Sequence, residues 1–165
     1  MKECTPICST VIIINFIVFL LYFTSIIKTI PCDNDMKSIF VSNFIHIDYK
    51  HLLANAFGIY ALSRIEEKIG IYEFLKLLIF ILVIFTILET LLHNIYKEIN
   101  CSIGFSGIIL GMITYEYIKN YGAIDYEILL SLIIYLIVPS YFSPNVSFSG
   151  HLLGVVAGII ASYII

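Results

Sequence analysis

The amino-acid sequence predicts an all-α membrane protein, folded as a bundle of six transmembrane helices. The chain of 165 residues is 60% hydrophobic and only 13% charged, with a mean hydropathy of +0.99. A soluble domain of this length cannot bury so much apolar surface. The apolar residues also form six runs, which are separated by short segments rich in proline, glycine, asparagine or charged residues. We therefore expect a single domain over residues 1–165, with residues 1–8 as a short N-terminal leader.

The net charge excludes one class of function. At -3, with a pI near 5.7, the chain has no basic surface of the kind that binding to nucleic acid requires. The expected partner is the lipid bilayer, and we expect no nucleic-acid partner.

The first three runs are defined by where polar residues interrupt them. Run 9–30 is almost entirely aliphatic and aromatic, and as a helix it would extend ~33 Å, enough to cross a bilayer. Pro31 ends it, and residues 33–37 indicate an aqueous or interfacial loop. The second helix is expected over 44–62, with Gly70 in a C-terminal capping position after it, and the third over 72–92.

The last three runs are connected by similarly short links. A polar segment at 94–100 leads into the fourth run at 103–119, and a turn at 121–122 precedes the fifth at 126–138. Residues 139–145 include two prolines and interrupt the chain again before the sixth run at 148–165. Six spans with such short connections leave no room for a separate domain.

Alternation of the six spans places several polar side chains near the same face of the membrane. The second, fourth and sixth helices must run in the same direction, so residues near their starts share one depth. His51 and Asn55 lie early in the second, Ser106 opens the fourth, and His151 opens the sixth.

Glycine spacing indicates which of these helices touch. Glycines at intervals of four form a stripe of small residues on the fourth helix and another on the sixth: Gly107 and Gly111, then Gly150, Gly154 and Gly158. Such stripes permit close approach of two backbones, although each stripe alone is also an ordinary packing motif. Ser106 and His151 adjoin the leading glycines. If the stripes face one another, the two side chains come within hydrogen-bonding reach.

The motifs that carry chemistry occur in a fixed order along nearly the whole chain: His46, His51, Asn55, Glu66, Gly70, Gly104, Ser106, Gly107, Gly150, His151, Gly154 and Gly158. In this order and on these spans, the set resembles the rhomboid family of intramembrane serine proteases. A lone glycine-x-serine-glycine motif is weak, whereas the ordered set is specific.

The resemblance implies a complete catalytic apparatus. Ser106 would be the nucleophile and His151 the general base of a serine–histidine dyad. The oxyanion would be stabilised by the Ser106 backbone N–H, the His51 side chain and the Asn55 amide. The expected substrates are transmembrane helices of single-pass proteins, admitted past the fifth helix, and no metal or cofactor is implied.

The chain differs from many members of the family at two places. It contains no tryptophan, and Lys37 and Ser38 stand where a tryptophan–arginine pair is common in the first loop. Leu110 stands where many relatives place an aromatic ring against the catalytic histidine. Neither difference removes a group that acyl transfer needs, so we expect activity.

If the N-terminus is cytosolic, five basic residues face the cytosol and four lie outside. So small a difference gives little information on orientation in the membrane. The resemblance implies a cytosolic N-terminus, with the site toward the extracytoplasmic or lumenal face. On that side Cys32 and Cys101 fall in loops where an oxidising compartment would allow them to pair. Glu89 and His93, four apart at the end of the third helix, are interpreted as marking the membrane interface.

Two other functions compete with the protease. A catalytically silent rhomboid-like protein would bind membrane-protein clients without cutting them. A channel, transporter or metal-binding bundle would use His46, His51 and His151, but the sequence lacks a dense ligand motif such as HExxH, and such a function leaves the glycine-flanked serine unexplained.

Overall fold

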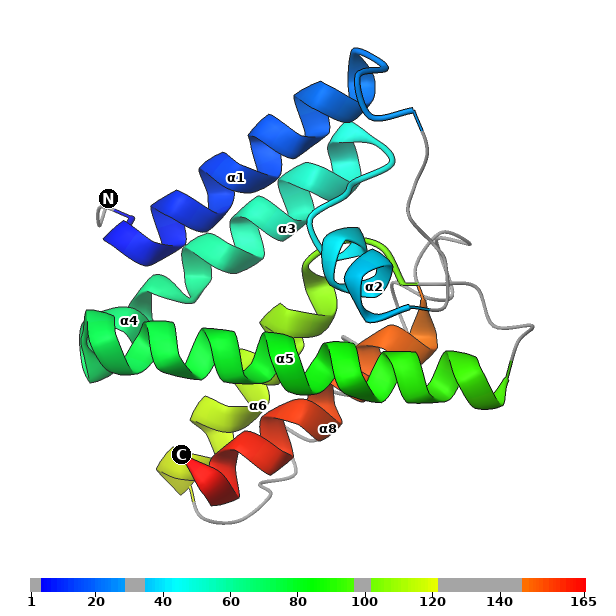
Figure 1. Ribbon diagram of the computed structural model, residues 1–165. Coiled ribbons are helices and arrows are strands. Elements are labelled where there is room, and N and C mark those ends of the chain that lie inside the picture. The colour runs from blue at the N-terminus through cyan, green and yellow to red at the C-terminus, as the bar shows by residue number, and fades with distance from the viewer. Residues whose placement is uncertain (1–3, 29–34, 97–101, 122–146) are drawn as a thin grey trace.

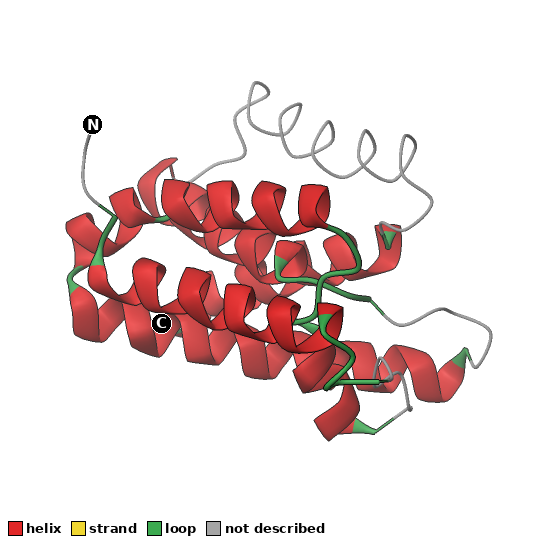
Figure 2. Ribbon diagram, turned by 90° about the horizontal axis from the view of Figure 1, so that it is seen from above, coloured by secondary structure: helices red, strands yellow, loops and turns green. Residues whose placement is uncertain are grey.

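The computed structural model describes residues 4–28, 35–96, 102–121 and 147–165, and within them every regular element is a helix (Figure 1). The all-α prediction is therefore confirmed for these residues. The described helices are α1 Pro6–Phe23, α2 Met36–Ser42, α3 Tyr49–Ala61, α4 Ser63–Ile69, α5 Ile71–Ile95, α6 Ser106–Tyr121 and α8 Phe148–Ile164. Short loops and turns join α2 to α3, α3 to α4 and α4 to α5 (Figure 2). The fifth predicted run, 126–138, lies outside the described residues.

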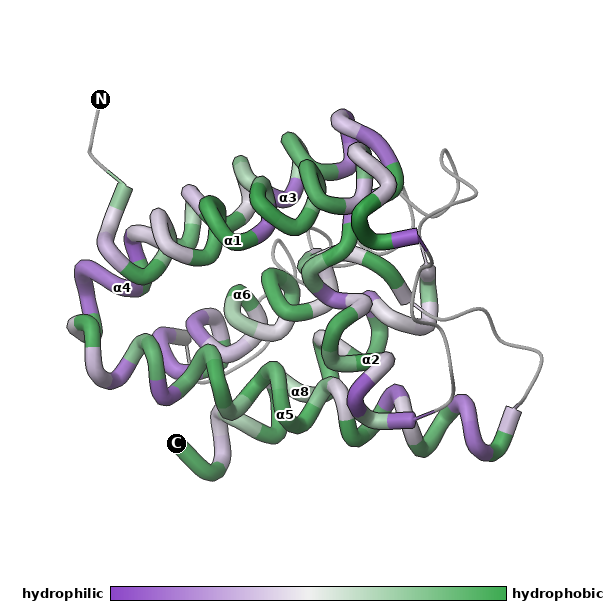
Figure 3. Tube along the Cα trace, turned by 45° about the horizontal axis from the view of Figure 1, so that its top comes forward, coloured by the Kyte–Doolittle hydropathy of each residue, from purple (hydrophilic) through white to green (hydrophobic). Residues whose placement is uncertain are grey.

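Two of the described helices are long and apolar enough to cross a membrane by themselves. α1 has 18 residues with a mean hydropathy of 2.3, and α5 has 25 residues with a most apolar window of 2.5. α8 is also apolar but has 17 residues. The hydrophobic colouring of these helices is plain in Figure 3.

The segment before α3 corrects the sequence prediction. Residues 36–42 form the short helix α2, because the Asp35 carboxylate caps it by accepting the N–H groups of Lys37 at 2.9 Å and Ser38 at 3.1 Å. The prediction of a helix from residue 44 was wrong at its start. Asp48 accepts the His51 N–H at 2.9 Å, and this cap fixes the beginning of α3 at Tyr49.

α4 and the turn that leads from it into α5 contain two residues that the sequence analysis named, Glu66 and Gly70. Gly70 caps α4, as predicted, with a φ of +83° that suits glycine. Glu66 of α4 is buried and binds the start of α1, where it accepts the N–H groups of Ile7 at 2.9 Å and Cys8 at 3.0 Å and the Thr5 hydroxyl. A carboxylate at a helix N-terminus is favourably placed. Burial alone would raise the pKa of Glu66, but these hydrogen bonds outweigh it and lower the pKa below its ordinary value.

The core forms where α5 crosses α6 and α8. Large buried side chains of α5, among them Phe74, Leu77, Ile81 and Phe85, form part of this core together with Ile108 and Met112 of α6 and the small residues Ala157 and Ala161 of α8. α1 and α3 lie side by side in Figure 1, on the side of α6 that is away from α8.

Glycines bring the backbones of α6 and α8 into direct contact. A Cβ added to Gly154 would overlap the Gly107 carbonyl oxygen, and one added to Gly158 would overlap that of Gly111. A Cβ on Gly111 would in turn lie 3.0 Å from the Gly154 carbonyl oxygen. Any side chain larger than hydrogen at these positions would therefore push the two helices apart.

Candidate active site

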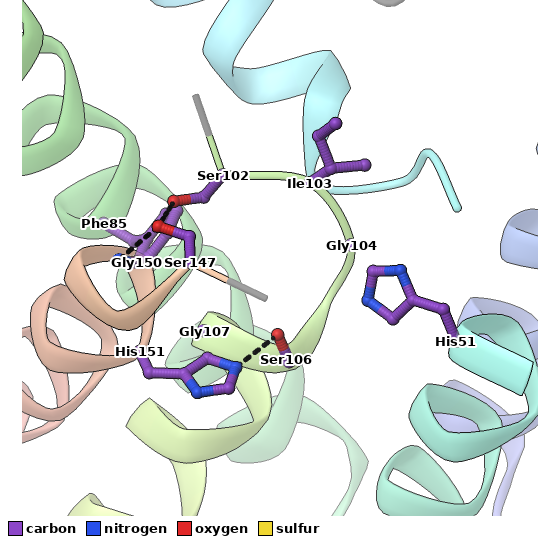
Figure 4. Close-up of a pocket in the computed structure, with 10 residues that line it drawn as sticks. All are labelled: His51, Phe85, Ser102, Ile103, Gly104, Ser106, Gly107, Ser147, Gly150 and His151. Atoms are coloured by element: carbon purple, nitrogen blue, oxygen red, sulfur yellow. Dashed lines mark hydrogen bonds between the residues drawn. The ribbon is translucent and has the colours of Figure 1, made fainter. Parts of the chain in front are cut away.

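Ser106 and His151 are joined by a hydrogen bond between their side chains. Ser106 is the first residue of α6 and His151 lies in the first turn of α8, and His151 Nε2 is 2.9 Å from Ser106 Oγ (Figure 4). His151 is buried. An imidazole nitrogen at this distance can accept the hydroxyl proton, which is the geometry that activates a serine.

The segment 102–105 fixes the position from which Ser106 begins its helix. Gly104 has a φ of +93°, and its N–H donates to the Ser42 carbonyl at 3.1 Å. Gly104 also lies against the imidazole of His51, since a Cβ there would lie 2.5 Å from His51 Nε2. Phe105 is buried, with its ring centroid 5.5 Å from that of Phe44. The backbone therefore has little freedom just before the serine.

Ser147 fixes the start of α8 in a similar way. Its Oγ accepts the Gly150 N–H at 3.1 Å, which caps the helix. The same Oγ accepts a hydrogen bond from Ser102 Oγ at 3.0 Å. The segments that precede Ser106 and His151 are thus bonded to each other, as the dashed lines in Figure 4 show. Gly150 leaves room for this bond, because a Cβ there would overlap Ser102 Oγ.

His51 and Asn55 reach the same place from α3. His51, Gly104, Ser106 and His151 line one small pocket together. Asn55 borders a neighbouring groove that Ser106 and His151 also line. The Asn55 side chain is buried, and its Nδ2 donates to the His51 carbonyl at 2.9 Å. All four polar residues that the sequence placed near one membrane face are therefore gathered at one site.

His46 and Leu110 lie beside this site. The rings of His46 and His51 meet edge to face, with centroids 4.9 Å apart, and His46 is fully buried. Leu110 is also buried and lines the groove with His151. Among the described residues, His151 Nδ1 has no hydrogen-bond partner, so no carboxylate of these residues holds the imidazole as it would in a triad.

Glu89 and His93, which the sequence analysis interpreted as markers of the membrane interface, have contacts inside the protein. Both side chains are buried at the end of α5, and Glu89 Oε1 accepts the Ser102 N–H at 2.8 Å. Sequence reasoning also missed Ser102 itself. Nothing in its local pattern distinguishes it, because its partners lie 13 and 45 residues away.

Several predicted features fall outside the described residues. These are the cysteines Cys32 and Cys101, the fifth run at 126–138 and the interruption at 139–145. Cys4 and Cys8, which the structure describes, are free thiols. Within the described ranges, no three histidine, cysteine, aspartate or glutamate side chains gather as metal ligands would.

Comparison with known proteins defines the class to which this fold and site belong. The sequence model of the Rhomboid domain matches residues 33–165, which is most of the chain. The protein is therefore a member of the rhomboid family, and hence a membrane protein.

Two relatives illustrate the range of similar proteins. A protein of Acanthamoeba polyphaga mimivirus that is named as a rhomboid protein is 27% identical over 148 residues, covering 89% of this chain and 85% of its own length. Rhomboid-like protein 14, mitochondrial, of Arabidopsis thaliana is 29% identical over 146 residues. That match covers 76% of this chain but only 42% of the plant protein.

Proposed function

We propose that this protein is an intramembrane serine endopeptidase that cleaves the transmembrane helices of single-pass membrane proteins. The observation that carries the proposal is the 2.9 Å hydrogen bond between Ser106 Oγ and His151 Nε2 in a member of the rhomboid family. His151 is buried among packed helices and Ser106 is half-buried beside it, which supports chemistry at membrane depth rather than in bulk water.

In the proposed reaction, Ser106 Oγ attacks the carbonyl carbon of the scissile peptide bond while His151 Nε2 takes the hydroxyl proton. The tetrahedral intermediate then expels the amine, which receives the proton from His151, and an acyl-enzyme remains on Ser106. Water, deprotonated by the same imidazole, attacks the ester carbonyl, and the imidazolium returns the proton to Ser106 Oγ as the carboxylic acid product leaves. Both half-reactions use one base, so a dyad is sufficient.

The negative oxygen of the intermediate needs donors, because hydrocarbon provides none. We assign this role to the Ser106 backbone N–H, the His51 side chain and the Asn55 amide. Ser106 begins α6, and the first N–H groups of a helix have no partner within it. His51 and Asn55 are one helical turn apart on α3 and border the space around Ser106. Their convergence from a separate helix supports the assignment.

The proposed architecture has six transmembrane spans, with a cytosolic N-terminus and the site toward the extracytoplasmic or lumenal face. The starts of α3, α6 and α8 meet at the Ser106 pocket, which is what parallel second, fourth and sixth spans require. The two helices that are long enough to span by themselves, α1 and α5, fit the first and third positions of this order.

Cleavage of a transmembrane reporter in liposomes tests the proposed function. The wild-type protein is expected to cut the reporter, and Ser106→Ala or His151→Ala to abolish cutting. Ser162→Ala is a matched control, since this serine lies on α8 and its hydroxyl donates to the Ile159 carbonyl of the same helix. If the folded wild-type protein does not cut the reporter, and the wild type and all variants bind it equally well, the result would instead favour a catalytically silent protein that binds membrane-protein clients.

A further inference from the structure

A carboxylate and an imidazole lie side by side inside the protein near the end of α5. Glu89 is 1% exposed and His93 is 2% exposed, and His93 Nε2 lies 3.7 Å from Glu89 Oε1. Neither side chain lines the pocket around Ser106. Buried ionisable groups are costly unless they are paired or hydrogen-bonded, so the partners of Glu89 indicate what it does.

The partner of Glu89 is the backbone that leads to the serine. Glu89 Oε1 accepts the Ser102 N–H at 2.8 Å, which is within the usual range for an N–H to oxygen hydrogen bond. Gly104, two residues later, is bonded to the Ser42 carbonyl. The segment 102–105 is therefore held at both ends before Ser106 begins α6, and Glu89 supplies the first attachment.

The same attachment extends to the helix that carries the histidine. Ser102 Oγ donates to Ser147 Oγ at 3.0 Å, and Ser147 Oγ accepts the Gly150 N–H at 3.1 Å. His151 follows Gly150 directly. A continuous series of hydrogen bonds thus runs from Glu89 through Ser102 and Ser147 to the first turn of α8.

We infer that Glu89, with His93 beside it, is a positioning residue that sets the register between Ser106 and His151. This inference rests on the proposed peptidase function, because the register matters only if the two residues react together. Glu89 acts through Ser102 and does not touch the reacting atoms. It is therefore expected to affect turnover rather than substrate binding, since the groove beside Ser106 is lined by residues of α3 and α6 and by His151 of α8, and no residue of α5 lines it.

The test compares steady-state cleavage of a transmembrane reporter in liposomes by the wild type and Glu89→Ala. Removing the acceptor frees Ser102, and a displacement of about 1 Å at a reacting group costs about 100-fold in rate. We expect kcat to fall at least about tenfold in Glu89→Ala, with KM unchanged within about twofold, on the same reasoning. Hydrogen–deuterium exchange in segment 102–107 should become faster in this variant.

Two further variants separate positioning from folding. Glu89→Gln keeps a carbonyl oxygen that can accept the Ser102 N–H. This variant should therefore have the kcat of the wild type and the slow hydrogen–deuterium exchange of the wild type, even though the carboxyl group is gone. Glu73→Ala is the matched control, because Glu73 is on the same helix but is exposed and forms an ion pair with Lys76 in the next turn. It should behave as wild type.

The outcomes distinguish this inference from the proposed function. An active wild type together with a Glu89→Ala variant of unchanged kcat and exchange overturns the inference and leaves the function standing. If the folded Glu89→Gln and Glu89→Ala variants lose kcat equally, the inference is also overturned. The oxygen that accepts the Ser102 N–H would then not be the cause of the loss. A folded wild type that never cleaves overturns the function, and the positioning role with it.

Discussion

Replacing Gly154 by alanine should separate the two helices that carry Ser106 and His151. The new Cβ would overlap the Gly107 carbonyl oxygen, and because this obstacle is backbone, no side-chain rotation relieves it. Restoring an ordinary contact of ~3.5 Å requires α6 and α8 to move apart by about 1 Å at this level. The Ser106–His151 hydrogen bond, at 2.9 Å, would not survive such a shift.

The expected losses follow from that displacement. Overpacking of this kind costs about 1 to 3 kcal/mol of stability, and a misplacement of about 1 Å lowers reaction rates about 100-fold. The assay is the rate at which a fluorophosphonate labels the protein in detergent, measured beside thermal unfolding. Gly58→Ala is the matched control, since the nearest atoms to its Cβ would be side-chain atoms of Ile109, with Cδ1 at 2.9 Å and Cγ2 at 3.3 Å, and not backbone. Wild-type labelling by Gly154→Ala would refute the reasoning.

Three further predictions concern single side chains. Asn55→Ala should lower kcat for a transmembrane reporter about 10²- to 10³-fold with little change in KM, because an oxyanion donor acts mainly in the transition state; a change confined to KM would contradict this. Ser147→Ala should lower the free energy of unfolding by ~1 kcal/mol through loss of the α8 cap, as measured by denaturation in micelles, and an unchanged stability would argue against the cap. Glu66 has a pKa below its ordinary value of 4.5 in the folded protein, so its ionised form stabilises the fold above that pH and this contribution is lost as the pH falls through the lowered pKa. Melting temperatures of the wild type should therefore decline on acidification below about pH 4.5, whereas those of Glu66→Gln should start lower at neutral pH and decline less; parallel curves would count against the role of this carboxylate.

The contact between Ser106 and His151 could be predicted because it depends on regular features of the sequence. Helix periodicity and the alternation of spans place both residues near the starts of parallel helices. The glycine stripes then bring those helices together, with Gly154 against Gly107. Each of these steps uses repeats of four residues or runs of apolar residues, which a sequence displays directly.

The attachments of the loops could not be predicted in the same way. In the sequence, Glu89 stands at the end of an apolar run and cannot be distinguished from a residue at the membrane surface. Its role depends on the hydrogen bond to Ser102, 13 residues away, which no local pattern predicts. The hydrogen bond from Ser102 to Ser147 joins residues 45 positions apart and has no periodic signature. The helix at 36–42 was missed because its cap, Asp35, stands among the polar residues that indicated a loop.

The central claim is that the His151 imidazole makes the Ser106 hydroxyl a nucleophile. Mass spectrometry of the protein after reaction with a fluorophosphonate tests it most directly, by locating the adduct. We expect a single adduct on Ser106 in the wild type and none in a folded His151→Ala variant. An adduct on another residue, or equal modification of Ser106 with and without His151, would contradict it.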